Sequence, residues 1–385
     1  MRRMLRLVAW GEEGAGWEAD LLRALGDSEL LAFEQSASQG KAFLTAVWRQ
    51  AEGEAEVVRV AAELGIAHVV EETSTPVETG PGWEVVAIGR PLVGPAIAAL
   101  LERLGEVGAR PVRMERRSAR GGLDLLRLRV AGPDERIAGL RTALVEQAAL
   151  QGYDLGLQRL DVHRRHKRLV VMDMDSTLVT IEVIDELARA CGKYEQVAEI
   201  TERAMRGEFD FEQSLRARVA LLAGQRAEIL DHIAENLPLT EGAEIFVEAL
   251  RRLGIRTAVL SGGFVPGVEA LRKRLGLDYA FANRLEVREG RFTGELEGPI
   301  VDARRKAELL SWIAGREGVD LAQVVAVGDG ANDRMMLERA GLGVAFRAKP
   351  ALRLVADANF GLGGLDSILY LFGLSDEEIA ALVSS

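Results

Sequence analysis

The sequence predicts an α/β protein with a parallel sheet, preceded by two smaller units that each have the order strand, helix, strand, strand, helix, strand. Three observations lead to this fold class. The pattern of apolar runs and turn residues repeats once within the first 160 residues. Strands alternate with helices from about residue 168 onward. Three short apolar runs, at residues 169–172, 257–260 and 324–327, have the composition of strands buried on both faces.

Length and charge limit the class of protein further. The chain has 385 residues, and a typical domain has about 100 to 200, so two or three domains are expected. With 48 basic and 59 acidic residues, the net charge of −11 offers no basic surface for nucleic acid, and we expect no such partner. The single cysteine, Cys191, and only four histidines favour a reduced, cytoplasmic compartment. No run approaches the roughly 18 apolar residues of a membrane span, and no export signal follows the basic start.

The two N-terminal units are expected at residues 1–78 and 79–162. In the first, glycines end or join strands and helices that we place at residues 5–10, 17–25, 30–33, 42–48, 54–64 and 67–70. In the second, the corresponding segments are residues 83–88, 91–104, 112–114, 125–130, 133–149 and 154–160.

This element order resembles the ACT domain, a ferredoxin-like sandwich that often binds amino acids and pairs side by side in regulated enzymes. The second unit is the closer match, because Gly89-Arg90-Pro91 enters its helix as in the family. In the first unit residues 11–14 replace that loop, so we expect a degenerate copy. The resemblance implies a homodimer and an allosteric amino acid such as serine. A module that only dimerises is the alternative, because a fold alone does not determine function.

The remaining residues, 163–385, are expected to form the α/β domain with a helical insertion at about residues 184–241. Within the insertion Ile184, Leu187, Ala188 and Cys191 recur at the spacing of one helix face. Because the insertion lies between the first and second strands of the sheet, we predict a small helical cap.

Polar residues follow each of the three buried strands. They are Asp173 and Asp175 after the first strand, Ser261 and Gly262 after the second, and Asp329, Asn332 and Asp333 after the third. The carboxyl ends of parallel strands share one edge of a sheet, where ligands bind, so these residues should converge. Several carboxylates at one place repel one another unless a hard cation and a lysine compensate their charge. Lys306 is the candidate for this lysine. Each residue alone is explained by a turn, a cap or a surface charge. Their order and placement together indicate catalysis.

These residues resemble the four motifs of the haloacid dehalogenase superfamily, over about residue 168 to the end of the chain. The resemblance implies a phosphatase in which Asp173 attacks phosphorus and forms an aspartyl phosphate. Asp175 would protonate the leaving alkoxide and then deprotonate the hydrolytic water. Mg²⁺ would be held by Asp173, the backbone carbonyl of Asp175, and Asp329.

The same resemblance assigns the groups around the transferred phosphate. Ser261, the amides near Gly262, and Lys306 would bind the phosphoryl oxygens, whose charge must be stabilised during transfer. Asn332 would contact phosphate or water. For Asp333 two roles stay open, which are support of the metal and orientation of Lys306.

A further series of residues resembles the phosphoserine phosphatase family within the superfamily. It comprises residues 173–179, Glu182, residues 205–207 and residues 209–219. The resemblance implies O-phospho-L-serine as the small-molecule substrate, in the last step of serine formation. Glu182 would pair with the substrate ammonium and Arg218 with its carboxylate, while Met205 and Phe211 would wall the pocket. Without the resemblance these residues read as a helix-end acid, a surface ion pair and core packing.

Two alternative functions remain. One is an amino-acid-sensing regulatory protein whose phosphatase domain has lost activity, but no motif residue is missing. The other is a phosphatase or phosphotransferase for another small phosphate ester, which would share every residue except those that set specificity in the cap.

Overall fold

A computed structural model describes residues 4–12, 29–38, 41–49, 54–73, 82–92, 94–164 and 166–384. Contacts between residues divide the chain into two units, Met1–Asp161 and Val162–Ser385. Among the described residues no helix combines the length and the apolar character that crossing a membrane requires.

The first half of the N-terminal unit is an antiparallel sheet with the strand order β2-β3-β1-β4. Its elements are β1 (Met4–Glu12), β2 (Glu29–Ser38), β3 (Lys41–Arg49), α2 (Glu54–Glu63) and β4 (Ala67–Thr73). Leu7 and Ala9 lie on one face of β1 and are fully buried, as are Val57 and Ala61 one turn apart on α2. The helix expected at residues 17–25 lies outside the described residues.

The second half has the strand order β8-β5-β7-β6, again with antiparallel neighbours. Its elements are β5 (Gly82–Gly89), α3 (Gly94–Glu106), β6 (Arg110–Ala119), β7 (Leu123–Ala131), α4 (Asp134–Gly139), α5 (Arg141–Gln151) and β8 (Tyr153–Leu160). The helix expected at residues 133–149 is interrupted at Leu140, which ends α4 and precedes α5. When the strands of each half are numbered along the chain, both sheets have the spatial order second, third, first, fourth. The ACT identity of the two halves stays a prediction.

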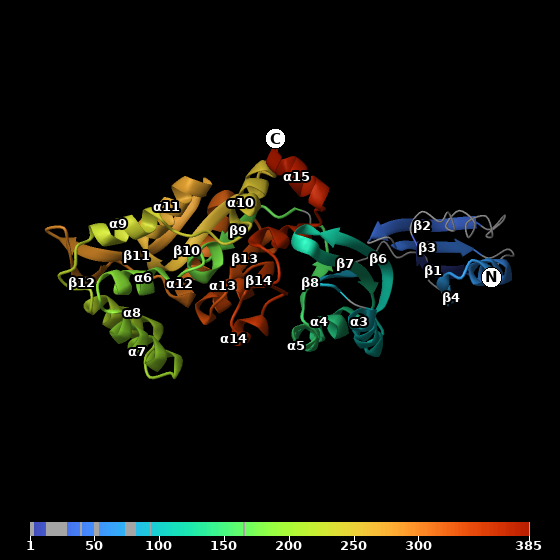
Figure 1. Cartoon of the computed structure of the whole chain (residues 1–385), viewed down its shortest axis with the longest axis horizontal. Helices are drawn as coiled ribbons and strands as arrows, with labels where there is room; N and C mark the ends of the chain where they lie inside the picture. Colours follow the sequence, from blue (N-terminus) through green and yellow to red (C-terminus); the bar gives the residue numbers. More distant parts are fainter. Residues whose placement is uncertain are drawn as a thin grey trace. The chain divides into compact units, whose positions relative to one another are not determined.

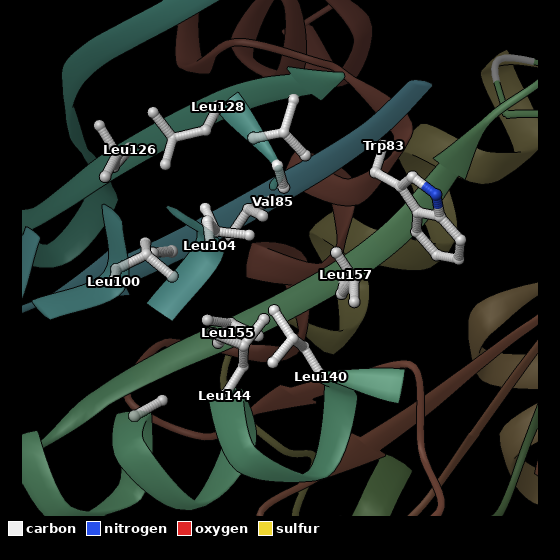
Figure 2. Close-up of a cluster of buried hydrophobic side chains, with 14 of the residues drawn as sticks. Trp83, Val85, Leu100, Leu104, Leu126, Leu128, Leu140, Leu144, Leu155 and Leu157 are labelled. Carbon is white, nitrogen blue, oxygen red and sulfur yellow. The ribbon is translucent and has the colours of Figure 1, made fainter. Parts of the chain in front are cut away.

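The core of this second half lies between one face of its sheet and its helices. Figure 2 shows side chains from β5, β7 and β8 directed toward Leu100 and Leu104 of α3 and toward Leu140 and Leu144. Trp83 on β5 also donates a hydrogen bond from Nε1 to Asp134 Oδ1 at 3.0 Å, at the start of α4. Burial of each large apolar side chain contributes about 1.5–3 kcal/mol, so this cluster stabilises the sheet against its helices.

The C-terminal unit is built on a sheet with the order β12-β11-β10-β9-β13-β14-β15. The strands are β9 (Leu169–Met172), β10 (Arg256–Phe264), β11 (Tyr279–Arg288), β12 (Arg291–Glu297), β13 (Val324–Gly328), β14 (Leu342–Phe346) and β15 (Ala358–Phe360). Neighbours from β11 to β15 are parallel, whereas β11 and β12 are antiparallel. The expected parallel sheet is therefore mixed at one edge. Glu289 and Gly290 take positive φ values of 51° and 71°, which suits a two-residue hairpin, and a hairpin joins antiparallel strands.

Helices cover both faces of this sheet. In Figure 1, α10 (Ala243–Arg252) and α11 (Val265–Leu275) lie above the strands, and α12 (Ala303–Glu317) and α13 (Arg334–Arg339) lie below them. Leu169 and Val171 of β9 belong to the same buried cluster as Leu310 and Ile313 of α12. The chain ends with α14 (Pro350–Arg353) and α15 (Asp376–Ser384). All four residues of β9 are fully buried, as their continuous apolar run predicts.

Between β9 and β10 the chain forms a helical insertion. Its helices are α6 (Val183–Ala190), α7 (Tyr194–Met205), α8 (Phe211–Ala220) and α9 (Glu228–Glu235), and α7 and α8 lie side by side (Figure 1). Helix α8 begins with a capping box, because Asp210 Oδ1 accepts from Gln213 N at 2.8 Å and Gln213 Oε1 accepts from Asp210 N at 3.1 Å. This helix carries Phe211 and Arg218.

Candidate active site

The strand register brings the ends of three strands to one place. In β9, Val171 pairs with Ala258 of β10 on one side and with Ala326 of β13 on the other. At the end of β9, Asp173 N donates to Val327 O at 2.9 Å. The residues that follow β9 and β13 therefore lie at the carboxyl edge of the sheet beside Ser261 and Gly262, which were expected to follow the second strand but lie within the last residues of β10.

Asp173 and Asp175 have different surroundings. Asp173 Oδ1 accepts from Met174 N at 2.6 Å, and its Oδ2 lies 2.8 Å from Lys306 Nζ. Ser176 takes a left-handed backbone conformation with φ of 57°, within the irregular turn that follows Asp173. In the same turn, Asp175 Oδ1 accepts from Val183 N at 2.8 Å, and Asp175 Oδ2 accepts from Ser261 Oγ at 3.0 Å. Asp173 thus contacts a fixed positive charge, whereas Asp175 is held by neutral donors.

Lys306 is fully buried and joins two carboxylates. Its Nζ lies 2.8 Å from Asp173 Oδ2 and 2.7 Å from Asp333 Oδ1. Burial by itself lowers the pKa of Lys306, but Asp173 and Asp333 outweigh it and raise that pKa above its ordinary value. Lys306 therefore remains a cation at neutral pH. It reaches the site from the first turns of α12, whose start is capped by Asp302 Oδ1 at 2.7 Å from Arg305 N.

The loop after β13 supplies two more carboxylates. Asp333 Oδ2 accepts from the backbone N–H groups of Asp329 and Gly330, both at 3.1 Å. Asp329 Oδ1 accepts from Thr177 Oγ1 at 3.2 Å. Asp173, Asp329 and Asp333 each offer an oxygen, and these oxygens lie within 4.8 Å of one another. Three carboxylates against one lysine leave an excess of negative charge at this point.

Burial perturbs the protonation of these acids. Burial first, and the carboxylates of Asp333 and Glu182 next, raise the pKa of Asp329 to about 7. Burial and Asp333 also raise the pKa of Asp173 well above its usual range, although Lys306 opposes them. The raised pKa values mean that these carboxylates are difficult to ionise unless a further cation compensates their charge. They therefore fit a site for a hard divalent metal, which prefers oxygen ligands.

Asp175 is perturbed in a way that suits proton transfer. Burial is the largest cause and the Glu182 carboxylate the next, and together they raise the pKa of Asp175 to about 7. The hydrogen bonds from Val183 and Ser261 partly oppose this shift. A carboxyl group with a pKa near the working pH can both give and take a proton.

The end of β10 after Leu260, where its pairing with β11 is irregular, is closely packed on both sides. Ser261 Oγ accepts from Gly263 N at 2.8 Å. A Cβ on Gly262 would lie 2.9 Å from Cζ of Phe211, and a Cβ on Gly263 would lie 2.9 Å from Asp175 Oδ2. Phe211 of the cap therefore lies against the segment that carries Ser261, and a side chain at residue 262 or 263 would require Phe211 or Asp175 to shift.

The cap residues are placed as follows. Glu182 precedes α6 and accepts from Ser176 Oγ at 2.9 Å. Burial lowers the pKa of Arg218, while Asp185, Glu182 and Asp175 raise it, so this guanidinium lies within the field of three carboxylates. Met205 ends α7 with 75% of its surface exposed. Asn332 does not belong to the cap but to the loop that follows β13, and its Nδ2 lies 3.5 Å from Asp173 Oδ2.

Three residues near the site were not singled out in the sequence. Ser176 and Thr177 directly follow the Asp-x-Asp motif, and their hydrogen bonds to Glu182 and Asp329 could have been suspected from that position. Asn283 on β11 carries no local signal. It is 2% exposed, donates from Nδ2 to Gly262 O at 2.8 Å, and accepts at Oδ1 from Val301 N at 2.8 Å.

Comparison with known proteins matches this geometry to a family. Residues 170–338 match the model of the haloacid dehalogenase-like hydrolases. A phosphoserine phosphatase of Streptomyces coelicolor is 47% identical over 297 residues, which cover 77% of this chain and 72% of that protein. This match is longer than the unit Val162–Ser385, so it extends into the N-terminal unit.

Two solved structures resemble the C-terminal unit. One is a phospho-aspartyl intermediate analogue of phosphoserine phosphatase, with 47% identity and a TM-score of 0.50, covering 53% of this chain and 98% of that one. The other is a substrate-bound phosphoserine phosphatase complex, with 46% identity and a TM-score of 0.51, covering 53% of this chain and 97% of that one. The chain therefore belongs to the phosphoserine phosphatase family of haloacid dehalogenase-like hydrolases.

Proposed function

We propose that the protein hydrolyses O-phospho-L-serine to L-serine and inorganic phosphate in a Mg²⁺-dependent reaction, as the final step of serine biosynthesis. The observation that carries this proposal is the buried contact of Asp173 with Lys306 at 2.8 Å, next to an Asp175 whose pKa is raised to about 7. In this arrangement Asp173 would act as a nucleophile beside the cation of Lys306, and Asp175 would act as the proton donor at the same site. The names of the relatives supply the substrate.

The proposed reaction has two steps. An oxygen of Asp173 attacks phosphorus, the bond from phosphorus to the seryl oxygen breaks, and Asp175 gives its proton to that oxygen. In the second step Asp175 takes a proton from water, which attacks phosphorus and releases phosphate and the free Asp173 carboxylate. The raised pKa of Asp175 supports both roles, and a phospho-aspartyl analogue has been captured in a similar protein.

The acidic residues fit the magnesium that this reaction needs. Asp173 and Asp329, with the backbone carbonyl of Asp175, would hold the ion, which when bound offsets the repulsion between the nucleophile and the phosphate. Asp333 already accepts from Lys306 and from two backbone N–H groups. We therefore assign Asp333 to the orientation of Lys306.

The remaining groups would bind the two ends of the substrate. Ser261, the amide at Gly262, and Lys306 would hold the phosphoryl oxygens, with Asn332 beside them. Glu182 would pair with the substrate ammonium and Arg218 with its carboxylate, because a guanidinium forms two parallel hydrogen bonds to a carboxylate. Phe211 and Met205 would wall the pocket.

Release of inorganic phosphate from O-phospho-L-serine tests the proposal. It should be measured with magnesium and with excess chelator, alongside O-phosphothreonine and an aryl phosphate. Fast release that prefers phosphoserine and stops with the chelator is expected. Activity on only the other esters would retain the chemistry and refute the substrate, and inactivity on all of them would favour a sensor protein.

For the N-terminal unit we propose amino-acid binding and pairing into a homodimer. Its two consecutive sheets with one shared strand order support this assignment. Titration calorimetry of the full chain with L-serine should show binding beyond that of the active site. Heat that disappears completely in the Arg218→Ala variant would contradict a separate N-terminal site.

A further inference from the structure

We infer that Asn283 is a positioning residue that fixes the end of β10 at Gly262 relative to the start of α12, the helix that carries Lys306. The inference rests on the proposed function, which assigns both segments to the phosphoryl group. Asn283 itself touches neither the nucleophile nor the proton donor.

The first bond of Asn283 controls the orientation of one peptide group. Asn283 Nδ2 donates to Gly262 O at 2.8 Å. The N–H of the same peptide group belongs to Gly263 and donates to Ser261 Oγ at 2.8 Å. Ser261 Oγ in turn donates to Asp175 Oδ2 at 3.0 Å. A continuous chain of hydrogen bonds therefore runs from Asn283 through this peptide group to Asp175.

The second bond of Asn283 reaches the other segment. Its Oδ1 accepts from Val301 N at 2.8 Å. Val301 precedes Asp302, which caps α12 and whose carbonyl accepts from Lys306 N at 2.9 Å. A single buried amide thus links the end of β10 at Gly262 to the first turn of the helix that carries Lys306.

These two bonds require the amide of asparagine at residue 283. Gly262 O needs a donor and Val301 N needs an acceptor, and one planar amide supplies both at once. A buried carbonyl or N–H group that loses its partner is strongly disfavoured. Loss of the donor would free the peptide between Gly262 and Gly263 to turn, and Ser261 would then lose its fixed place beside Asp175.

The substitution Asn283→Asp tests this role with almost no change of shape. Its carboxylate keeps an acceptor for Val301 N but lacks the donor for Gly262 O. At pH 8 we expect KM for O-phosphoserine and the inhibition constant of inorganic phosphate to rise together, by about tenfold or more. Burial raises the pKa of such a carboxyl, so at lower pH the protonated acid regains an O–H donor. The ratio of variant to wild type, measured at each pH, should therefore approach one as the pH falls.

Asn359→Asp is the matched control. Asn359 also lies on a strand of this sheet, β15, and donates from Nδ2 to the backbone carbonyl of Arg353 at 3.1 Å. This substitution removes a comparable hydrogen bond outside the chain that leads to Asp175. It should leave the inhibition constant of phosphate within about twofold of wild type.

A folded Asn283→Asp protein with wild-type phosphate inhibition at every pH would overturn the inference, whatever its melting temperature. If that variant does not fold, Asn283→Ser carries the same expected loss of phosphate affinity without recovery at low pH. Failure of the proposed function is recognised separately, because the wild type would then not hydrolyse phosphoserine. Calorimetric binding of inorganic phosphate to the wild type and the variants would still decide the role of Asn283.

Discussion

Single side chains in this site differ in function because their surroundings differ. Asp173 lies 2.8 Å from a buried ammonium group, whereas Asp175 accepts from a serine hydroxyl and a backbone N–H. Lys306 stays charged because two carboxylates outweigh its burial and raise its pKa. The two aspartates, two residues apart, therefore suit a nucleophile and a proton donor respectively.

Replacing Asp173, the proposed nucleophile, should abolish turnover. Asp173→Asn removes the negative oxygen, and a neutral amide is a poor nucleophile toward phosphorus. We expect phosphate release to fall by more than about a thousandfold, with a circular dichroism spectrum like that of wild type. Turnover that stays within tenfold of wild type would show that another group attacks phosphorus.

Replacing Glu182 or Arg218, the residues proposed to bind the two charged groups of the substrate, should change specificity without stopping the chemistry. Glu182→Gln and Arg218→Ala should each raise KM for phosphoserine by about tenfold or more, while hydrolysis of an aryl phosphate changes little. Arg216→Ala is the matched control on the same helix, because Arg216 pairs with Glu212 at 2.8 Å and is 46% exposed. If Arg218→Ala behaved like Arg216→Ala, the substrate carboxylate would have to be bound elsewhere.

At the level of elements, some bounds were predicted accurately and others were not. The expected strands at residues 30–33 and 112–114 are the longer strands β2 and β6, whereas the expected helix at residues 54–64 matches α2 within one residue. The expected strand at residues 169–172 has the same bounds as β9, because four consecutive apolar residues match a strand covered on both faces. The expected helix at residues 133–149 is two helices that meet at Leu140. The hairpin of β11 and β12 was not expected, since Glu289 adopts a positive φ without being glycine.

The start of α8 offers a test of how an element supports the cap. Asp210→Ala removes the carboxylate that accepts from Gln213 N at 2.8 Å, and loss of such a cap costs about 1 kcal/mol of stability. We expect a lower urea midpoint for the C-terminal unit and a modest rise in KM, because Phe211 and Arg218 lie on this helix. Glu212→Ala should have a smaller effect on the midpoint. Equal midpoints for the two variants would argue against the capping box.

For the whole molecule, the acidic site links metal binding to pH and stability. The pKa of Asp329 is raised to about 7 in the folded protein, against an ordinary value of 3.8. Without metal, the folded protein therefore holds the Asp329 proton more tightly than the unfolded chain does. The contribution of this proton to folding stability is fully present below pH 3.8 and is lost as the pH rises through 7. Magnesium competes with this proton, so its apparent affinity should fall about tenfold per pH unit below 7.

Thermal unfolding with and without magnesium measures this linkage. A ligand that binds only the folded protein stabilises it, so the rise in melting temperature caused by about 5 mM Mg²⁺ should be larger at pH 8 than at pH 5.5. Asp329→Asn should lose most of this rise at both pH values. Asp357→Asn is the control and should retain the rise, because Asp357 accepts from Gly343 N at 2.8 Å and is not one of the three clustered carboxylates. A magnesium effect that is equal at the two pH values would contradict the proposed ligand set.

The primary sequence determines the chemistry that is available and the elements that present it. Continuous apolar runs specify the buried strands, and the polar residues directly after them specify which groups reach the carboxyl edge, because both patterns are local. The tertiary structure alone decides the contacts between distant segments. Ser261 meets Asp175 across 86 residues, and Asn283 meets Gly262 and Val301 from a neighbouring strand. The raised pKa values likewise depend on burial by several segments at once, and a local pattern in the chain does not encode that packing.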